Sequence, residues 1–175
     1  MAALMLVSCR PDSVFAEPVR PKPKAFVHPG ITLTSSNLDF VKAKLEAGEE
    51  PWKAAWEELV DSRYAKFRRS PRPRAHVSRG PYGNPDLGAK EFVRDGTAAY
   101  THALIWAIKQ ENAHAQKAAE ILSAWSDTLK SIRHHDAALL VGMSGQQYCI
   151  AAEILKHTSD VWPTEEQEHL SLIHI

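Results

Sequence analysis

The sequence is poor in cysteine, has no excess charge of either sign and contains no long hydrophobic run. Two cysteines among 175 residues are too few for a disulfide framework. Lys and Arg together number 21, as do Asp and Glu, so no overall electrostatic field favours nucleic acid as a partner. No apolar run approaches the ~20 residues of a membrane-spanning helix. These absences leave a globular chain with no transmembrane helix and no disulfide scaffold.

Ligand spacings typical of zinc sites, C-x-x-C and H-x-x-x-H, are also absent. His134, His135 and Asp136 are adjacent in the chain and cannot all converge on one ion without ligands from elsewhere. We therefore expect no metal ion and no cofactor. Cys149 lies in an apolar helical pattern, where a buried thiol is the expected state.

The clearest pattern lies in residues 91–129 and predicts two consecutive amphipathic helices joined by a short polar turn. Apolar residues recur there at three- and four-residue steps, which place them on one helical face. The first face contains Phe92, Ala99, Ala103, Trp106 and Ala107, and the second contains Ala115, Ala118, Leu122, Trp125 and Leu129. Asn112 is expected to cap the second helix. Because neither helix can bury its stripe alone, this antiparallel hairpin needs neighbours.

Further helices are expected on both sides of the hairpin. Ser36 and Asp39 have the spacing of a capping box and predict the start of one helix. Pro51 is suited to the first position of a second. A long helix is predicted over 137–157, with its apolar stripe interrupted at Gln146. The predicted class is all-α, built from antiparallel helical hairpins.

A basic segment precedes the central hairpin. Residues 63–79 carry seven cations, and no acidic residue occurs from Arg63 until Asp86. Four prolines and three glycines within 67–88 exclude long regular structure. A loop of this length in a compact domain is commonly a lid or a binding loop, and arginine can bind a carboxylate through two hydrogen bonds. A solvated surface loop is the alternative.

The N-terminus resembles an export signal. A short apolar leader ends in LVSC at Cys9, which resembles the bacterial lipobox and makes Cys9 a candidate for lipidation. VFA, ending at Ala16, fits an ordinary signal peptidase instead. We interpret 1–16 as an export signal, with an apolar terminus of no function as the alternative. Residues 17–25 are rich in proline and form a linker.

The other end of the chain is expected to be non-native. LSLIHI at 170–175 resembles the translation of a sequencing adapter. We therefore expect a non-native tail there and a natural sequence that ends, in this chain, near His169.

A 33-residue repeat offers a different fold. AAEIL at 118–122 recurs at 151–155, close to the period of tetratricopeptide repeats, which would make the chain a peptide-binding solenoid. One period earlier, residues 85–89 lie in the proline-rich loop, and solenoids need about three repeats for stability. The repeat therefore fails.

Several short sequences point to a family. They are FVHPGI at 26–31, Asp39, AGEEPW at 47–52, RGPYGNP at 79–85, RDGTAAY at 94–100 and AEILSAW at 119–125. Their order and spacing from Phe26 to Trp162 resemble the N-terminal half of the alginate lyase family. The resemblance implies an incomplete (α/α) toroid over 26–169, in which helical hairpins ring a cleft for an acidic polysaccharide. It also implies a periplasmic or outer-cell-surface location.

The activity implied by the resemblance is β-elimination in a uronate-containing polymer such as alginate. A base removes the proton on C5, the bond from C4 to the glycosidic oxygen breaks, and an unsaturated sugar is left. The carboxylate beside C5 must first be neutralised. In this family an Asn-His pair and a catalytic Tyr lie in the second half of the toroid. Because this chain has no Asn-His dipeptide, we expect the catalytic residues downstream of His169 and no lyase activity from this chain alone.

The resemblance also suggests substrate contacts within this chain. They are expected from Arg79, Tyr82 and Asn84 in the lid region, and further from Arg94, His134, His135 and Gln146. The alternative function is that of an exported, non-catalytic helical module that binds an anionic glycan or a protein through the basic loop 63–85.

Overall fold

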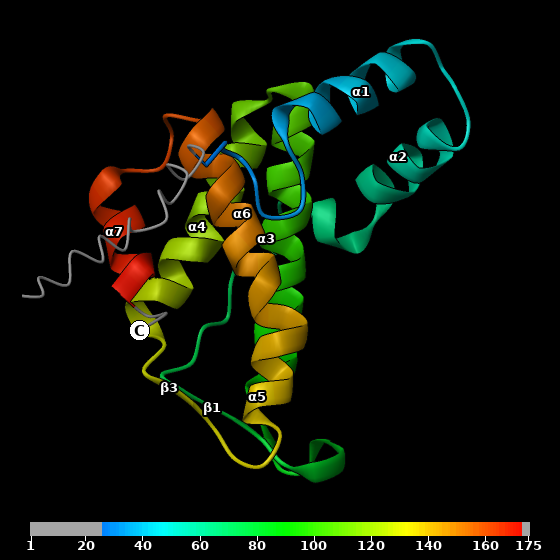
Figure 1. The fold of residues 1–175 in the computed structure, drawn as a ribbon. Coiled ribbons are helices and arrows are strands. Elements are labelled where there is room, and N and C mark those ends of the chain that lie inside the picture. The colour runs from blue at the N-terminus through cyan, green and yellow to red at the C-terminus, as the bar shows by residue number, and fades with distance from the viewer. Residues whose placement is uncertain (1–25, 173–175) are drawn as a thin grey trace, which may run out of the picture.

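The computed structural model describes residues 26–172 and is mostly helical (Figure 1). The expected export signal with Cys9, the linker 17–25 and the last three residues of the adapter-like tail lie outside the described residues. The helical class agrees with the prediction, and a small three-stranded sheet adds to it. No described helix is both long enough and apolar enough to cross a membrane.

The centre of the fold is the predicted hairpin. It consists of α3 (Ala89–Lys109) and α4 (Asn112–Thr128), which are separated by two residues and lie side by side (Figure 1). Both predicted faces are buried, with Ala99, Ala103, Ala115 and Ala118 completely inaccessible. Small side chains at these positions allow the two helices to approach closely, and the prediction of an alanine-rich interface is confirmed.

The helix caps differ from the expected ones. The N-cap of α4 is Glu111 without a side-chain hydrogen bond, so the prediction that Asn112 caps this helix is wrong. Instead, Gln110 closes the end of α3 in a left-handed conformation and donates from Nε2 to the Trp106 carbonyl at 3.0 Å. The first capping box is formed by Thr34 with Asn37, two residues earlier than predicted.

The long helix predicted over 137–157 is present but is not uniform. It begins as α5 (Ala137–Leu140), passes through a π-helical turn (Val141–Gly145) and continues as α6 (Gln146–Thr158). A π-turn inserts an extra residue and rotates the side chains that follow it. Met143 is therefore 58% exposed, although it belongs to the predicted apolar stripe, whereas Ile154 and Leu155 are buried.

The remaining helices lie around this core. The α1 (Ser35–Glu46) and α2 (Trp52–Asp61) pair extends to one side, and α2 buries none of its residues (Figure 1). A 3₁₀ turn (Arg63–Ala65) connects α2 to the basic segment. At the other end, α7 (Thr164–Leu172) packs against α4. Leu170, the first residue of the adapter-like sequence, is buried in the core.

Part of the basic segment forms a strand of a three-stranded sheet. The order is β2-β1-β3, with β1 (His76–Arg79) in the centre, β2 (Asp86–Leu87) antiparallel to it and β3 (Ser131–Arg133) parallel to it. Val77 in β1 is completely buried. The sheet therefore fixes the basic segment to the chain that follows α4.

Three aromatic rings form the core between α3, α4 and α6. Phe92 stacks on Tyr148 with ring centroids 4.7 Å apart and meets Trp125 edge-on at 5.3 Å. The Tyr148 hydroxyl donates to the Phe92 carbonyl at 2.8 Å. α6 approaches α3 closely here because Gly96 has no side chain.

Replacing Gly96 by alanine is expected to lower the free energy of unfolding by about 1–2 kcal/mol in urea denaturation. A Cβ atom there would lie 2.6 Å from Cε2 of Tyr148, whose ring is held by Phe92. Overpacking costs ~1–3 kcal/mol, and the better helix propensity of alanine recovers up to ~1 kcal/mol. Gly142→Ala is the control, because a Cβ at Gly142 meets nothing within 4 Å. Equal destabilisation by both substitutions would contradict the packing argument.

Candidate functional site

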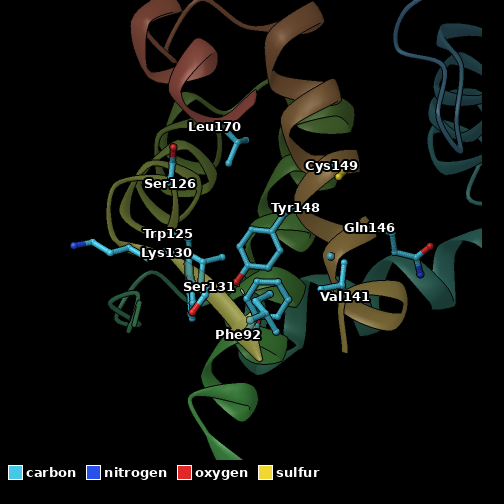
Figure 2. Close-up of a pocket in the computed structure, with 13 residues that line it drawn as sticks. Phe92, Trp125, Ser126, Lys130, Ser131, Val141, Gln146, Tyr148, Cys149 and Leu170 are labelled. Atoms are coloured by element: carbon cyan, nitrogen blue, oxygen red, sulfur yellow. Dashed lines mark hydrogen bonds between the residues drawn. The ribbon is translucent and has the colours of Figure 1, made fainter. Parts of the chain in front are cut away.

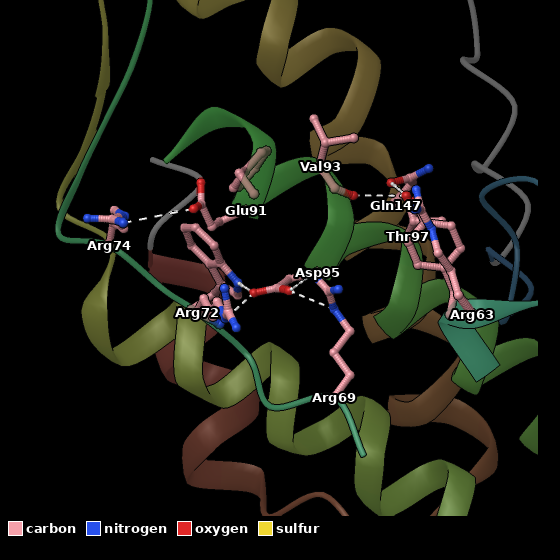
Figure 3. A network of polar contacts seen from close by, with 12 residues as sticks. Arg63, Arg69, Arg72, Arg74, Glu91, Val93, Asp95, Thr97 and Gln147 are labelled. Carbon is pink, nitrogen blue, oxygen red and sulfur yellow. Dashed lines mark hydrogen bonds and ion pairs between the residues drawn. The ribbon is translucent and has the colours of Figure 1, made fainter. Parts of the chain in front are cut away.

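A buried carboxylate holds the basic segment against the helices (Figure 3). Asp95 on α3 is completely inaccessible and accepts hydrogen bonds from Arg69 Nη2 at 2.9 Å and from the backbone N–H of Arg72 at 2.7 Å. Trp125 Nε1 donates to the same carboxylate at 2.9 Å. The partner of Asp95 is therefore Arg69, 26 residues away, and the adjacent Arg94 is left for other contacts.

This arrangement divides the cations of the basic segment by role. Arg69 is engaged with Asp95, and Arg74 lies 3.8 Å from Glu91. Arg79 and Arg94 form no ion pair with any residue in 26–172 that the structure describes. Arg63, Arg68 and Arg72 form no such ion pair either, so the guanidinium groups of Arg79 and Arg94 are two of those available for an anion.

These two arginines line one groove, which we call the basic groove. It has a volume of about 510 Å³ and lies between the 3₁₀ turn Arg63–Ala65, the β1–β2 connection, the first half of α3 and the π-turn. Its lining combines cationic, polar and apolar side chains and is formed by Arg63, Tyr64, Arg79, Tyr82, Gly83, Asp86, Ala89, Lys90, Val93, Arg94, Leu140, Met143 and Ser144.

Each of the predicted contacts in the groove is positioned by a different element. Arg79 is the last residue of β1, and its carbonyl accepts the N–H of Asp136 at 3.0 Å. Tyr82 lies in the 3₁₀ turn Pro81–Gly83 with φ 55°, and its side chain is fully exposed. Arg94 is exposed on α3, roughly 100° around the helix from the buried Asp95. The structure therefore brings together three residues that are up to 15 positions apart in sequence.

The other charges of the groove are partly compensated. Lys90 lies 3.3 Å from Asp86, whose carboxylate also accepts the N–H of Ala89 at the start of α3. The Arg63 guanidinium donates to the Tyr64 hydroxyl at 2.8 Å and lies over its ring. Arg63 keeps its full charge in this contact, so the groove retains a net positive charge.

A second hollow of about 410 Å³ continues the positive surface along α3. It is lined by Arg68, Arg69, Ser70, Arg72, Glu91 and Arg94. Arg94 borders both hollows, so the cationic surface extends beyond the basic groove on the same side of α3. An extended surface of this kind suits a ligand with repeated negative charges better than a single small anion.

An apolar cavity of about 420 Å³ lies on the other side of the π-turn (Figure 2). Phe92, Trp125 and Tyr148 form its floor, and Cys149 and Leu170 lie at its wall. Burial raises the pKa of the Tyr148 hydroxyl well above its ordinary value, and the Asp95 carboxylate adds to the shift. Tyr148 is therefore a neutral hydrogen-bond donor and is not suited to act as a base.

The other predicted site residues lie outside the basic groove. Gln146 lines the apolar cavity and extends away from its rings (Figure 2). Asn84 is exposed beside the groove, at the end of the 3₁₀ turn. His134 and His135 are exposed after β3, and His135 Nδ1 lies 2.7 Å from Asp136.

Among the charged and aromatic residues of the groove, Arg63, Tyr64, Asp86 and Lys90 were not predicted individually as site residues, although Arg63 and Tyr64 lie in the basic loop 63–85. Arg63 and Tyr64 begin the basic segment, and Lys90 lies one turn before Arg94 on α3. Arg63 and Tyr64 carried a usable signal, because a cation and an aromatic ring adjoin at the point where the helical pattern ends. Lys90 carried none, since an exposed lysine in the first turn of a helix is ordinary.

The groove can bind anions but offers little for other chemistry. Its basic side chains neutralise carboxylates, and the rings of Tyr64 and Tyr82 provide flat surfaces for a sugar. Asp86 is its one carboxylate, so its residues do not form a metal site. Comparisons of the chain with protein-family models, curated proteins and solved structures give no match.

Proposed function

We propose that this chain is the N-terminal part of an exported polysaccharide lyase that acts on a uronate polymer, and that the basic groove binds the carboxylates of this acidic polysaccharide. The observation that carries the proposal is the pair of guanidinium groups of Arg79 and Arg94, which face one groove without carboxylate partners among the described residues. An arginine beside a uronate carboxylate lowers the cost of the carbanion that forms at C5.

The proposed fold of the whole enzyme is an (α/α) toroid. The α3/α4 hairpin, with α6 packed on α3, supplies successive helices of such a ring (Figure 1). In this proposal the base and the Asn-His pair come from residues downstream of His169, and Arg79, Tyr82 and Arg94 hold the substrate. A periplasmic or cell-surface location belongs to the same proposal, because that is where such a polymer is met.

Binding of oligouronate tests the groove. The 175-residue chain is expected to bind an alginate oligosaccharide in isothermal titration calorimetry and not to bind a neutral oligosaccharide of equal length. Arg79→Ala and Arg94→Ala are each expected to weaken binding about tenfold, or roughly 1.4 kcal/mol, because each removes a charge-assisted contact. Lys156→Ala is the control. It removes an exposed cation about 18 Å along α6 from Ser144. Equal losses in all three variants would contradict a specific groove.

The alternative, a non-catalytic module that binds anionic glycan or protein through residues 63–85, predicts the same binding but no product. A longer chain that supplies the residues expected downstream of His169 separates the two functions. The lyase is expected to produce near-ultraviolet absorbance from the unsaturated sugar. Binding without any such absorbance, with every uronate polymer tried, would favour the module.

A further inference from the structure

Three potential metal ligands from distant parts of the chain meet at the C-terminal half of α6. Glu153 and His157 lie four residues apart on this helix, so both side chains project from the same face. His28 comes from the segment that precedes α1. The candidate ligand atoms of the three residues all lie within 4.8 Å of one another. Within residues 26–172, this is the one group of three or more such ligands that is close enough to share an ion.

The distances within this cluster are close to those of a metal site. His157 Nε2 lies 3.6 Å from Glu153 Oε2, and His28 Nδ1 lies 2.6 Å from Glu153 Oε1. A tetrahedral zinc ion with bonds of about 2.0–2.1 Å holds its ligand atoms about 3.3 Å apart. The first pair therefore fits with little change. In the second pair, His28 Nδ1 and Glu153 Oε1 share a proton. An ion can replace that proton if the two atoms move apart by less than about 1 Å.

The carboxylate at the centre of the cluster is held in place by the backbone. The N–H of Gly30 donates to Glu153 Oε1 at 3.1 Å, and the Glu153 side chain is only 14% exposed. Gly30 has to lack a side chain, because a Cβ atom there would lie 2.3 Å from the carbonyl oxygen of Val27. The tight turn therefore aims both the Gly30 amide and the His28 ring at Glu153. Hydrogen bonds of this kind orient the ligands of metal sites.

We propose that His28, Glu153 and His157 bind a divalent first-row transition-metal ion of the zinc type. Two imidazoles and one carboxylate are ligands that Zn²⁺ accepts, whereas Ca²⁺ and Mg²⁺ require mainly oxygen ligands. With neutral imidazoles the three residues carry one negative charge, which attracts a cation. The side chains of His28 and His157 are 41% and 26% exposed, so an ion and a water ligand can reach them from solvent.

Besides the separation of His28 from Glu153, binding requires a rotation of one histidine ring. The rings of His28 and His157 are stacked, with centroids 3.9 Å apart and planes 12° from parallel. Two parallel rings cannot both direct a nitrogen lone pair at one ion, so one ring has to turn. His28 is the more exposed of the two, and turning its ring would also change its contact with the Phe26 ring, whose centroid lies 4.8 Å away. An ion therefore replaces the ring stack and the shared proton with bonds to a common centre.

The ion would fasten the segment before α1 to the end of α6, two parts of the chain separated by 125 residues. It lies on a different part of α6 from the basic groove, which is bordered by the π-turn before this helix. The metal site therefore goes beyond the proposed polysaccharide binding. The sequence indicates only half of it, since Glu153 and His157 have helical spacing and His28 is remote.

The test is a titration of Zn²⁺ into the 175-residue chain, treated with chelator and without a polyhistidine tag, followed by calorimetry. We expect one ion per chain and a rise in Tm that Mg²⁺ at the same concentration does not produce. His157→Ala and Glu153→Gln are each expected to weaken Zn²⁺ binding at least tenfold and to abolish the rise in Tm. Visible absorption of Co²⁺ in the same site reports nitrogen ligation independently.

His135→Ala is the matched control, because His135 forms the same type of contact with Asp136 at 2.7 Å elsewhere on the chain. This control is expected to bind Zn²⁺ as the wild type does. If Glu153→Gln fails to fold, His28→Ala removes a ligand from the exposed side of the site and serves in its place. Absence of stoichiometric binding, or equal binding by the wild type and His157→Ala, overturns the proposal. Oligouronate binding is expected to stay unchanged in the His28, Glu153 and His157 variants, so the two proposals can fail separately.

Discussion

Replacing Asp95 by alanine is expected to lower the free energy of unfolding by about 3–5 kcal/mol, as measured by urea denaturation. The substitution removes the only acceptor shared by Arg69, the Arg72 backbone and Trp125 within the described residues. Trp125 is 2% exposed, so its indole N–H would remain buried without a partner. An unsatisfied buried donor costs about 1–3 kcal/mol by itself, and the loss of the ion pair adds to that cost.

Asp95→Asn refines this test because it keeps the volume of the side chain. One amide oxygen remains, but an NH₂ group then faces donors that need an acceptor. We therefore expect Asp95→Asn to be destabilised nearly as much as Asp95→Ala. Asp127→Ala is the control on α4, where an exposed carboxylate lies 3.0 Å from His169. Its expected effect is within about 0.5 kcal/mol, and a comparable loss from Asp127→Ala would show that Asp95 is not a special position.

The Asp95 contacts also explain how the basic groove is kept open. They hold the chain at Arg69 and Arg72 against α3, and the sheet holds it again at β1. Arg63 lies just before the first attachment and Arg79 at the end of β1, and both line one groove. A loss of the Asp95 contacts is therefore expected to weaken oligouronate binding indirectly, through the position of the segment.

The sequence predicts the helices well because their signals are local. The alanine-rich faces of α3 and α4 repeat at helical spacing, and their burial follows from that spacing alone. The sheet could not be predicted in the same way. Strands β1 and β3 are only four and three residues long, and they pair across 55 positions, as in His76 with Ser131.

The sequence also predicted the candidate site only in part. Arg79, Tyr82 and Arg94 were named from the sequence, and they line one groove. From the sequence, an ion pair between the neighbours Arg94 and Asp95 is a reasonable expectation. Adjacent residues on a helix, however, point about 100° apart. Asp95 therefore enters the core, and Arg94 faces the groove. Gln146 lies elsewhere because the π-turn before it separates the basic groove from the apolar cavity.

A buried pair of histidines between α3 and α4 is expected to make the free energy of unfolding depend on pH. His102 Nδ1 lies 2.8 Å from His114 Nδ1, and the Phe67 ring packs on both imidazoles. Burial, followed by the nearby charges of His114 and Lys117, lowers the pKa of His102 to about 4 from its ordinary 6.5. The pKa of His114 is lowered by burial, with Glu111 opposing the shift. Both rings are therefore neutral in the folded protein at pH 7.

The folded state is expected to lose stability as the pH falls from 6.5 towards 4. Across this window the unfolded chain binds a proton at His102 that the folded chain does not, so protonation favours unfolding. The loss of unfolding free energy caused by His102 is absent above pH 6.5 and reaches about 2–3 kcal/mol between pH 5 and pH 4. His114 acts in the same direction. Urea denaturation at a series of pH values between 7 and 4 measures the effect.

His102→Asn isolates this contribution from the carboxylates that titrate in the same range. Asparagine can keep a hydrogen bond to His114 Nδ1 but does not titrate. The variant is expected to be less stable than the wild type at pH 7. It is also expected to lose less stability on acidification, because its side chain binds no proton. His76→Asn is the matched control, because His76 is exposed and bonds Ser131 at 2.9 Å. The control should follow the wild-type pH profile. If His102→Asn also follows that profile, the pKa of His102 is not lowered in the folded protein as described, and the buried pair does not cause the pH dependence.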